Sequence, residues 1–332
     1  VQKEVFSLVI FFCSMLASSA SHPVSHLYSF KSRHMGVDFR IDLFAADSKK
    51  AEFAATTAFA QIAKIDASMS DYKVDSELSQ LSMSSGSDKS IQVSQGLWTV
   101  LNKAKKMHRL SSGAFDITSG PSVILWRRAC FFKTLPPSRS LARAKEKCGM
   151  DHLLFHPETR SLTLKPKGMR LDLGGIAKGY AADEALKTLR SLGIKHALVD
   201  GSGDMAMTRH PHARWKIFIS DKEDHTDQFI HMQNGAGATS GDSYQFIEIK
   251  NNRYSHIIDP RTGIGVTNRC RVTIIAPDAM TADSLASAVT VMGPKQGLKL
   301  IESLPNVEAL IVAPGRTYQS TNFPHLIQKQ KN

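Results

Sequence analysis

The sequence predicts one α+β domain with mixed or antiparallel sheets and packed helices. Alternating apolar residues indicate short strands, longer amphipathic stretches indicate isolated helices, and these do not follow one another as a regular strand–helix–strand repeat. With 332 residues, 42% hydrophobic and 22% charged, the chain has the composition of a globular protein. We place the domain at residues 35–325, after a linker at 21–34 and before a basic tail at 326–332.

The first predicted elements are a strand and a helix. Apolar residues alternate with polar ones from Val37 to Leu43, which is the period of a half-buried strand. Ser48 is then expected to cap a helix whose apolar positions recur at helical spacing up to Met69. Further helices are predicted over residues 97–110, 177–192, 281–292 and 295–304. Further strands are predicted over residues 197–199, 215–220, 246–249, 272–276 and 309–312.

The first twenty residues have the pattern of a signal peptide. An apolar run from Val5 to Phe12 follows Lys3, and the small residues Ser18 and Ala20 suit a signal peptidase. We therefore expect an exported protein, in a bacterial periplasm and associated with the inner membrane if the segment is kept. An uncleaved membrane anchor stays open, although the apolar run is shorter than a span needs.

The charge balance favours anionic ligands. The chain has 42 Lys and Arg against 30 Asp and Glu, a formal net charge of +12, which suits phosphates. Basic residues are scattered and not interleaved with aromatic ones, so nucleic acid is not an expected partner. The four cysteines form no CxxC pair, which argues against a zinc site, and a bridge between Cys130 and Cys148 stays open.

Three segments carry residues suited to chemistry. In the first, Asp172 to Tyr180, two glycines lead from an apolar strand end into a helix, so that backbone amides and Lys178 could meet a phosphate. A plain structural turn is an equally good interpretation.

The second segment lies on a predicted helix. Asp283 and Ser287 are four residues apart, so their oxygens share one helical face and suit a hard cation such as Mg²⁺. The alternative is that Asp283 only complements the helix dipole.

The third segment, Tyr254 to Gly263, is a strand end closed by a turn. His256 could accept a proton near neutral pH, and Asp259 could orient the turn. A purely structural histidine is the competing interpretation.

These segments, together with Thr239 to Asp242, resemble the motifs of the FAD:protein FMN transferase family, the ApbE family. The resemblance lies in the residues of the motifs and in their order, and it extends from about Met35 to about Leu304. The resemblance implies an ApbE-type, T-fold-like flavin transferase fold. It also implies a magnesium-dependent enzyme that moves FMN from FAD onto a Thr or Ser hydroxyl of an acceptor flavoprotein, with release of AMP.

The resemblance implies roles for individual residues. The positions that match FAD contacts are Met35, Tyr72, Ala114, Phe115, Asp116, Asp172, Lys178 and Ile258. The positions that match the magnesium site are Gly175, Asp283, Ala286 and Ser287. We expect His256, Asp283 and Lys178 to be catalytic, with His256 as the base. An FAD pyrophosphatase that makes FMN and AMP, and an exported FAD-binding protein without catalysis, are the alternatives.

Two positions depart from the family pattern. Ser287 stands where the family usually has Thr, and either hydroxyl can approach magnesium. Ser202 replaces a glycine in the segment Asp200 to Asp204, which puts the backbone conformation there in question.

Overall fold

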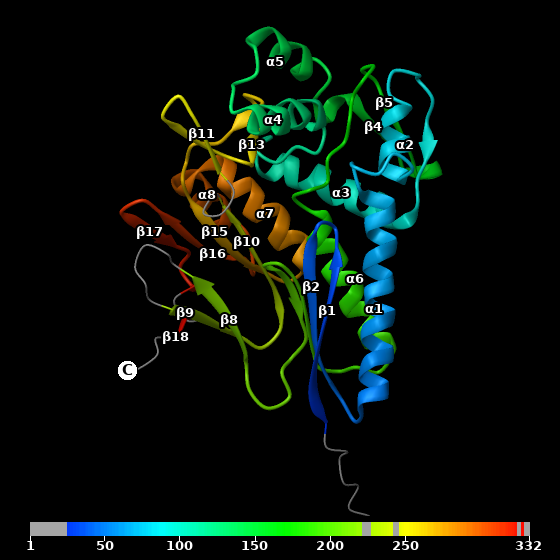
Figure 1. Cartoon of the computed structure of the whole chain (residues 1–332), viewed down its shortest axis with the longest axis vertical. Helices are drawn as coiled ribbons and strands as arrows, with labels where there is room; N and C mark the ends of the chain where they lie inside the picture. Colours follow the sequence, from blue (N-terminus) through cyan, green and yellow to red (C-terminus); the bar gives the residue numbers. More distant parts are fainter. Residues whose placement is uncertain (1–24, 221–226, 242–245, 324–326, 329–332) are drawn as a thin grey trace, which may run out of the picture.

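An eight-stranded antiparallel sheet organises the fold (Figure 1). The computed structural model describes residues 25–220, 227–241, 246–323 and 327–328. Every neighbouring pair of strands in this sheet is antiparallel. In spatial order the strands are β1 (His26–His34), β2 (Val37–Ala45), β6 (Ala197–Gly201), β7 (Asp204–Met207), β10 (Gly235–Gly241), β15 (Arg271–Ala276), β16 (Glu308–Ala313) and β17 (Arg316–Gln319).

Helices cover one face of this sheet and a smaller sheet covers the other. The helical layer consists of α1 (Ser48–Met69), α6 (Ala177–Ser191), α7 (Ala279–Met292) and α8 (Pro294–Glu302). On the opposite face, Leu198, Met207 and Leu310 share an apolar cluster with a three-stranded antiparallel sheet. Its strands are β8 (Trp215–Ser220), β9 (Asp227–Met232) and β18 (Ile327–Gln328). The predicted α+β class is confirmed.

The remaining elements gather at the upper end of the molecule in Figure 1. The helices there are α2 (Glu77–Met83), α3 (Gln95–Leu110), α4 (Gly120–Phe132) and α5 (Ser138–Lys145), with 3₁₀ turns η1 (Met150–His152) and η2 (Pro157–Thr159). A small sheet contains β3 (Ile91–Gln92), β5 (Ser161–Leu164) and β4 (Leu153–His156). Two hairpins pair β11 (Phe246–Ile249) with β12 (Asn252–Ser255) and β13 (Ile258–Asp259) with β14 (Ile264–Gly265).

The N-terminal half corrects two predictions. The predicted linker is wrong for residues 26–34, because they form β1, an edge strand paired along its whole length with β2. Ser48 does not cap α1, since the Asp47 side chain accepts the hydrogen bond from the amide of Lys50 and Ser48 is the first helical residue. The apolar stripe predicted for α1 does face the core, with Ile62, Ile65 and Met69 buried.

Several predictions concern the chain ends and the cysteines. The predicted signal peptide lies outside the described residues. In the predicted basic tail only Ile327 and Gln328 are described, and they pair with β9. No helix within residues 25–220, 227–241, 246–323 and 327–328 is long and apolar enough to cross a membrane. Cys130 and Cys148 are free thiols, so the bridge left open above is not formed.

Candidate functional site

A cleft of about 730 Å³ opens beside the first turn of α6, within the usual range for ligand pockets. Its walls come from α4, α6, α7, β10 and the segment around β13. Most residues predicted from sequence line it, namely Tyr72, Ala114, Phe115, Asp116, Asp172, Gly175, Lys178, His256, Ile258, Asp283 and Ser287. Met35 and Ala286 are not among the lining residues. The fold thus brings together segments that are up to about two hundred residues apart in the chain.

The turn before α6 is fixed by backbone amides that donate within the protein. The amide of Gly174 donates to Asp172 Oδ1 at 2.8 Å, and the amide of Asp172 donates to the carbonyl of Ile117 at 2.8 Å. Ile176, which precedes the helix, has no side-chain acceptor that could cap it. The amides of Ala177 and Gly179 also donate within the protein, to the carbonyl of Leu173 and to Asp283 Oδ2. The start of α6 lines the cleft, so the positive end of the helix dipole favours an anion there.

Asp283 joins α7 to α6 at the base of the cleft. Its side chain is buried, and its Oδ2 accepts a hydrogen bond of 3.0 Å from the amide of Gly179. Burial, with the Asp204 carboxylate nearby, raises the pKa of Asp283 to about 7, although Lys178 and the Gly179 amide oppose the shift. A cation at this carboxylate would favour its ionised form.

Lys178 and Asp204 form a buried ion pair at the same place. Lys178 Nζ contacts Asp204 Oδ2, and the Asp204 side chain is only 4% exposed. Burial alone would lower the pKa of Lys178, but the carboxylates of Asp204 and Asp283 raise it above its ordinary value. The ammonium is therefore charged at any pH near neutrality and is held in one orientation.

The oxygen donors around Asp283 fit a hard cation. Gly175 lies so close to α7 that a Cβ atom there would be 2.8 Å from Ser287 Oγ, so the glycine backbone and the serine hydroxyl meet. Mg²⁺ takes few protein oxygens and completes its shell with water and substrate phosphate. In the described part of the chain no group of three or more His, Cys, Asp and Glu side chains could hold a metal. A metal here would therefore depend on Asp283 with the hydroxyl and carbonyl oxygens around it.

Ala286 lies one residue from this donor set. Its carbonyl accepts the Thr290 hydroxyl at 2.8 Å within α7. Gly175, Asp283 and Ser287 lie together at the cleft, whereas Ala286 is buried away from its lining.

Arg127 was not predicted as a site residue, and it organises the mouth of the cleft. Its guanidinium donates to Asp71 Oδ2 at 2.5 Å and to Asp172 Oδ2 at 2.9 Å, and lies 4.4 Å from the centre of the Tyr72 ring. Burial and then the Asp71 charge raise the pKa of Asp172, and Arg127 opposes this shift. Tyr72 is 78% exposed, so its ring is available to a flat ligand.

Asp116 fixes another part of the cleft lining. Its Oδ1 accepts hydrogen bonds from the amide of Thr118 at 2.7 Å and from the Thr118 hydroxyl at 2.6 Å. His108 Nδ1 lies 3.1 Å from the carbonyl of Phe115 and 3.6 Å from Asp116 Oδ2. Phe115 and Ala114 are thereby fixed as a buried apolar surface.

His256 lies on the cleft lining at an exposed position, directly before β13. The turn that follows is held by Asp259, whose Oδ1 accepts from the amide of Arg261 at 2.9 Å and from its Nε at 2.8 Å. This agrees with the predicted orienting role of Asp259. The backbone next to His256 is also held, since the amide of Ile257 donates to Ser255 Oγ at 3.1 Å and the Ile257 carbonyl accepts from the amide of Val266 at 2.9 Å.

The segment from Asp200 to Asp204 forms a turn in which Ser202 takes the place of the family's glycine. Ser202 adopts a left-handed conformation with φ 58°, followed by Gly203 with φ 103°. Its hydroxyl donates to the carbonyl of Asp38 at 3.1 Å, and Asp200 Oδ1 accepts from the Gly203 amide at 2.8 Å. The serine keeps the turn that a glycine would adopt more readily, and this turn delivers Asp204 to Lys178.

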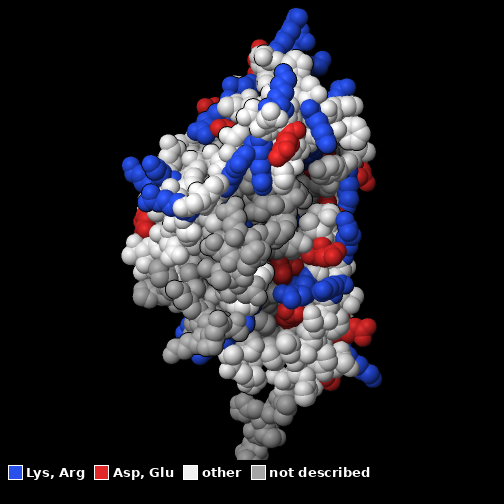
Figure 2. Space-filling model, turned by 60° about the vertical axis from the view of Figure 1, so that its left-hand side comes forward, with Lys and Arg blue, Asp and Glu red and all other residues white. Residues whose placement is uncertain are grey.

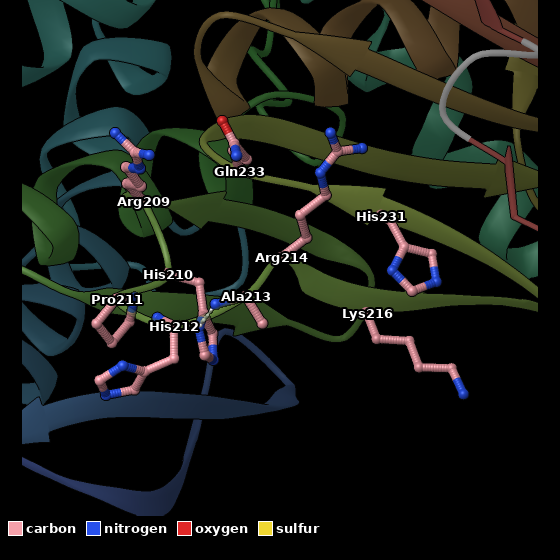
Figure 3. Close-up of a pocket in the computed structure, with 9 residues that line it drawn as sticks. All are labelled: Arg209, His210, Pro211, His212, Ala213, Arg214, Lys216, His231 and Gln233. Atoms are coloured by element: carbon pink, nitrogen blue, oxygen red, sulfur yellow. Dashed lines mark hydrogen bonds between the residues drawn. The ribbon is translucent and has the colours of Figure 1, made fainter.

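A second hollow lies between the β7–β8 connection and strands β8 and β9 (Figure 3). Its lining residues are Arg209, His210, Pro211, His212, Ala213, Arg214, Lys216, His231 and Gln233, which include no carboxylate. His210 packs edge-on against Trp215, and its Nδ1 accepts from the amide of Ala213 at 3.0 Å. None of the residues predicted from sequence lies here, so we place the chemistry in the cleft.

Comparisons with known proteins give one consistent result. A family model described as the ApbE family matches residues 35–311. A FAD:protein FMN transferase from Vibrio cholerae is 31% identical over 277 residues, 80% of this chain and 82% of that protein. Another, from Klebsiella pneumoniae, is 27% identical over 95% of this chain and 94% of that protein.

Solved structures agree. The ApbE protein from Thermotoga maritima superposes with a TM-score of 0.82 and 28% identity, covering 92% of this chain and 100% of that one. The flavin transferase ApbE from Vibrio cholerae gives a TM-score of 0.81 and 28% identity, covering 91% of this chain and 100% of that one. The similarity extends over the whole cleft.

Proposed function

The chain belongs to the ApbE family, and from this premise we propose that it is a magnesium-dependent transferase that moves FMN from FAD to a Thr or Ser hydroxyl of an acceptor protein. The observation that supports this is that Lys178, Asp283 and the glycine turn at the start of α6 all line one cleft. Positive charge and oxygen donors for a cation meet there. FAD is a pyrophosphate, and its cleavage depends mainly on positioning and charge neutralisation.

The reaction breaks one bond and forms one. The acceptor oxygen attacks the phosphorus atom on the FMN side, and the bond from that phosphorus to the bridging oxygen breaks. AMP leaves as a phosphate monoester, and FMN stays on the acceptor through a phosphoester bond. The hydroxyl proton goes to a base, for which we propose His256, the imidazole on the cleft lining.

The other residues bind and orient. Tyr72 and Phe115 provide aromatic surfaces for the flavin ring system, and Lys178, fixed by Asp204, presents its ammonium to the phosphates. Gly175, Asp283 and Ser287 would hold the magnesium ion. When bound, the ion supplies positive charge to the departing phosphate.

Hydrolysis is the second candidate. Because the cleft is open to solvent at Tyr72, water can reach the same phosphorus and would give FMN and AMP. The two activities differ only in the nucleophile that attacks the phosphorus, which is the acceptor hydroxyl in the transferase and water in the pyrophosphatase.

The test mixes the purified protein with FAD, MgCl₂ and an acceptor protein that the Vibrio cholerae relative labels with FMN. We expect covalent flavin fluorescence on the acceptor in a denaturing gel, with one AMP released per FMN attached. AMP without labelled acceptor would refute transfer and favour hydrolysis. FAD binding with neither product, whether or not Mg²⁺ is present, would favour a non-catalytic flavin-binding protein.

We also propose that the protein is exported to a bacterial periplasm, on the basis of the apolar run from Val5 to Phe12. Mass spectrometry of the protein recovered from cells tests this. A mature N-terminus close to residue 21 supports cleavage, and an intact apolar segment in a membrane fraction supports an anchor.

A further inference from the structure

Helix α4 has three distinct faces, and only two of them are accounted for by the cleft and the core. Val123, Arg127 and Cys130 line the cleft. Ser122, Trp126 and Ala129 are buried; Trp126 also borders the cleft, and with Ala129 it packs in an apolar cluster with Tyr254 and Ile258. The third face carries large apolar side chains that are exposed, namely Ile124 at 43%, Phe131 at 82% and Phe132 at 60%.

The two phenylalanines at the end of α4 pack against each other. Their ring centroids are 4.9 Å apart and the rings are nearly perpendicular, at 87°. Lys133 ends the helix in a left-handed conformation and donates its amide to the carbonyl of Ala129, which fixes the last turn. An ordered helix end therefore presents the aromatic pair, and clustered exposed apolar side chains of this kind mark interaction sites.

The surroundings of this aromatic pair are basic. Residues 120–148 contain seven Lys and Arg and a single Glu. The Arg128 guanidinium lies 5.7 Å from the centre of the Phe132 ring. Figure 2 shows Lys and Arg side chains gathered on the upper end of the molecule, the end at which α4 and α5 lie in Figure 1. A partner that covers the phenylalanines would therefore be apolar at the contact and acidic around it.

The exposed face is continuous with the mouth of the cleft. Phe131 follows Arg127 by four residues, which places it about 6 Å further along nearly the same face of the helix. Arg127 itself contacts Tyr72, which is exposed at the cleft mouth. This face of α4 therefore lies next to residues that line the cleft.

We propose that the apolar stripe of α4, formed by Ile124, Arg128, Phe131 and Phe132, is the docking surface for the acceptor protein. The matching surface on the acceptor is an apolar segment flanked by Asp or Glu residues, near the target Thr or Ser. This inference rests on the proposed transferase function. It adds that recognition of the acceptor is separate from the binding and cleavage of FAD.

The experiment compares two reactions of the variant with both phenylalanines replaced, Phe131→Ser with Phe132→Ser. The apparent KM for the acceptor labelled by the Vibrio cholerae relative is expected to rise about tenfold or more, because aromatic side chains dominate interface energies. FAD affinity and the slow release of AMP without acceptor are expected to stay at the wild-type values. Both side chains are exposed, so the melting temperature should also be unchanged.

Two matched variants serve as controls. Phe53, on α1, is 65% exposed and lies outside the cleft, so Phe53→Ser is expected to leave the acceptor KM unchanged. Arg128→Glu is expected to raise the KM and weaken its dependence on salt, whereas Lys49→Glu on α1 should do neither.

Failure of the docking surface and failure of the transferase function give different experimental results. Transfer by the Phe131→Ser, Phe132→Ser variant with a wild-type acceptor KM would overturn the docking surface and leave the transferase intact. If the wild-type protein releases AMP in the presence of the acceptor but attaches no FMN to it, both the docking surface and the transferase function are overturned. A wild-type dimer that these substitutions convert to a monomer, with an unchanged KM, would instead assign the stripe to contact between two copies of this chain and overturn acceptor docking.

Discussion

The cleft beside α6 and the hollow at β8 and β9 both present cationic side chains, but they hold them differently. In the cleft, Lys178 is paired with Asp204 and lies near a second buried carboxylate, Asp283. In the hollow, Arg214 and Lys216 are exposed and no carboxylate lines the surface. Burial and His212 lower the pKa of His210, which disfavours its charged form. Positive charge alone attracts phosphate, whereas buried charges of both signs offer partners to a cation as well as to a phosphate.

The largest loss of activity is expected for a substitution of Asp283 in the cleft. Asp283→Ala should reduce both FMN transfer and AMP release by about a thousandfold or more, because a metal site contributes several kcal/mol to charge stabilisation. The matched control is Asp278→Ala on the same helix, where the carboxylate caps α7 by accepting from the amide of Thr281 at 2.7 Å. That variant should lose about 1 kcal/mol of stability and keep its turnover. Equal turnover in wild type and Asp283→Ala would refute the metal role.

Replacing a histidine by asparagine in the cleft and in the hollow tests whether only the cleft takes part in the reaction. His256→Asn in the cleft should lower the rate of transfer by about a hundredfold or more while FAD still binds, since a general base contributes about 10²–10⁴. His231→Asn in the hollow should leave the rate unchanged. Steady-state rates at neutral pH decide this, and two variants with the same rate would remove His256 as the base.

A third prediction concerns the cations of the hollow. Replacing Arg214 and Lys216 together by Ala should change the transfer rate less than about twofold, because both side chains are exposed, neither lines the cleft, and salt screens exposed charges. Rates at low and physiological salt provide the measurement. A large loss of transfer rate at both salt concentrations would mean that the hollow takes part in the reaction, and the cleft would then not be the only site of chemistry.

The smallest expected effect is a change in the pH dependence of stability at Asp183. The Asp183 carboxylate accepts hydrogen bonds from the amides of Ala279 and Met280 at 2.9 and 3.0 Å. Burial raises the pKa of Asp183 to about 6, despite these hydrogen bonds. A carboxyl whose pKa is higher in the folded state binds more protons there, so its contribution to stability is lost as pH rises from about 4 to 6. Asp183→Asn should therefore show a weaker fall in unfolding free energy over this range than the wild type, measured by urea denaturation with chelator present. Parallel pH profiles would contradict this assignment.

The sequence alone could predict features that depend on local spacing. Asp283 and Ser287 share a helical face because they are four residues apart, and the glycine turn before α6 follows from two adjacent glycines. Strand β2 and the helices α1, α3, α6 and α7 were predicted for the same reason, whereas β1 and α4 were not. Their boundaries shift by one or two residues at caps, as at Asp47.

Features that depend on tertiary pairing could not be predicted in this way. Arg127 stood in a pair of arginines with the pattern of a solvated surface, and only the fold places it between Asp71 and Asp172. Asp204 belongs to the site because β7 lies beside α6, a contact that no local pattern encodes. His26–His34 was assigned to a linker because its polar residues hide the alternation of an edge strand that is mostly exposed.

The crossing of α6 and α7 at Gly179 limits how this protein can change over evolution. A Cβ atom at Gly179 would lie 2.2 Å from the carbonyl oxygen of Ala279 and 2.9 Å from Asp283 Cβ. Any other residue would push apart the helices that Asp283 joins. Every missense change of this codon adds at least that one carbon atom, so each would displace the backbone around the Asp283 carboxylate.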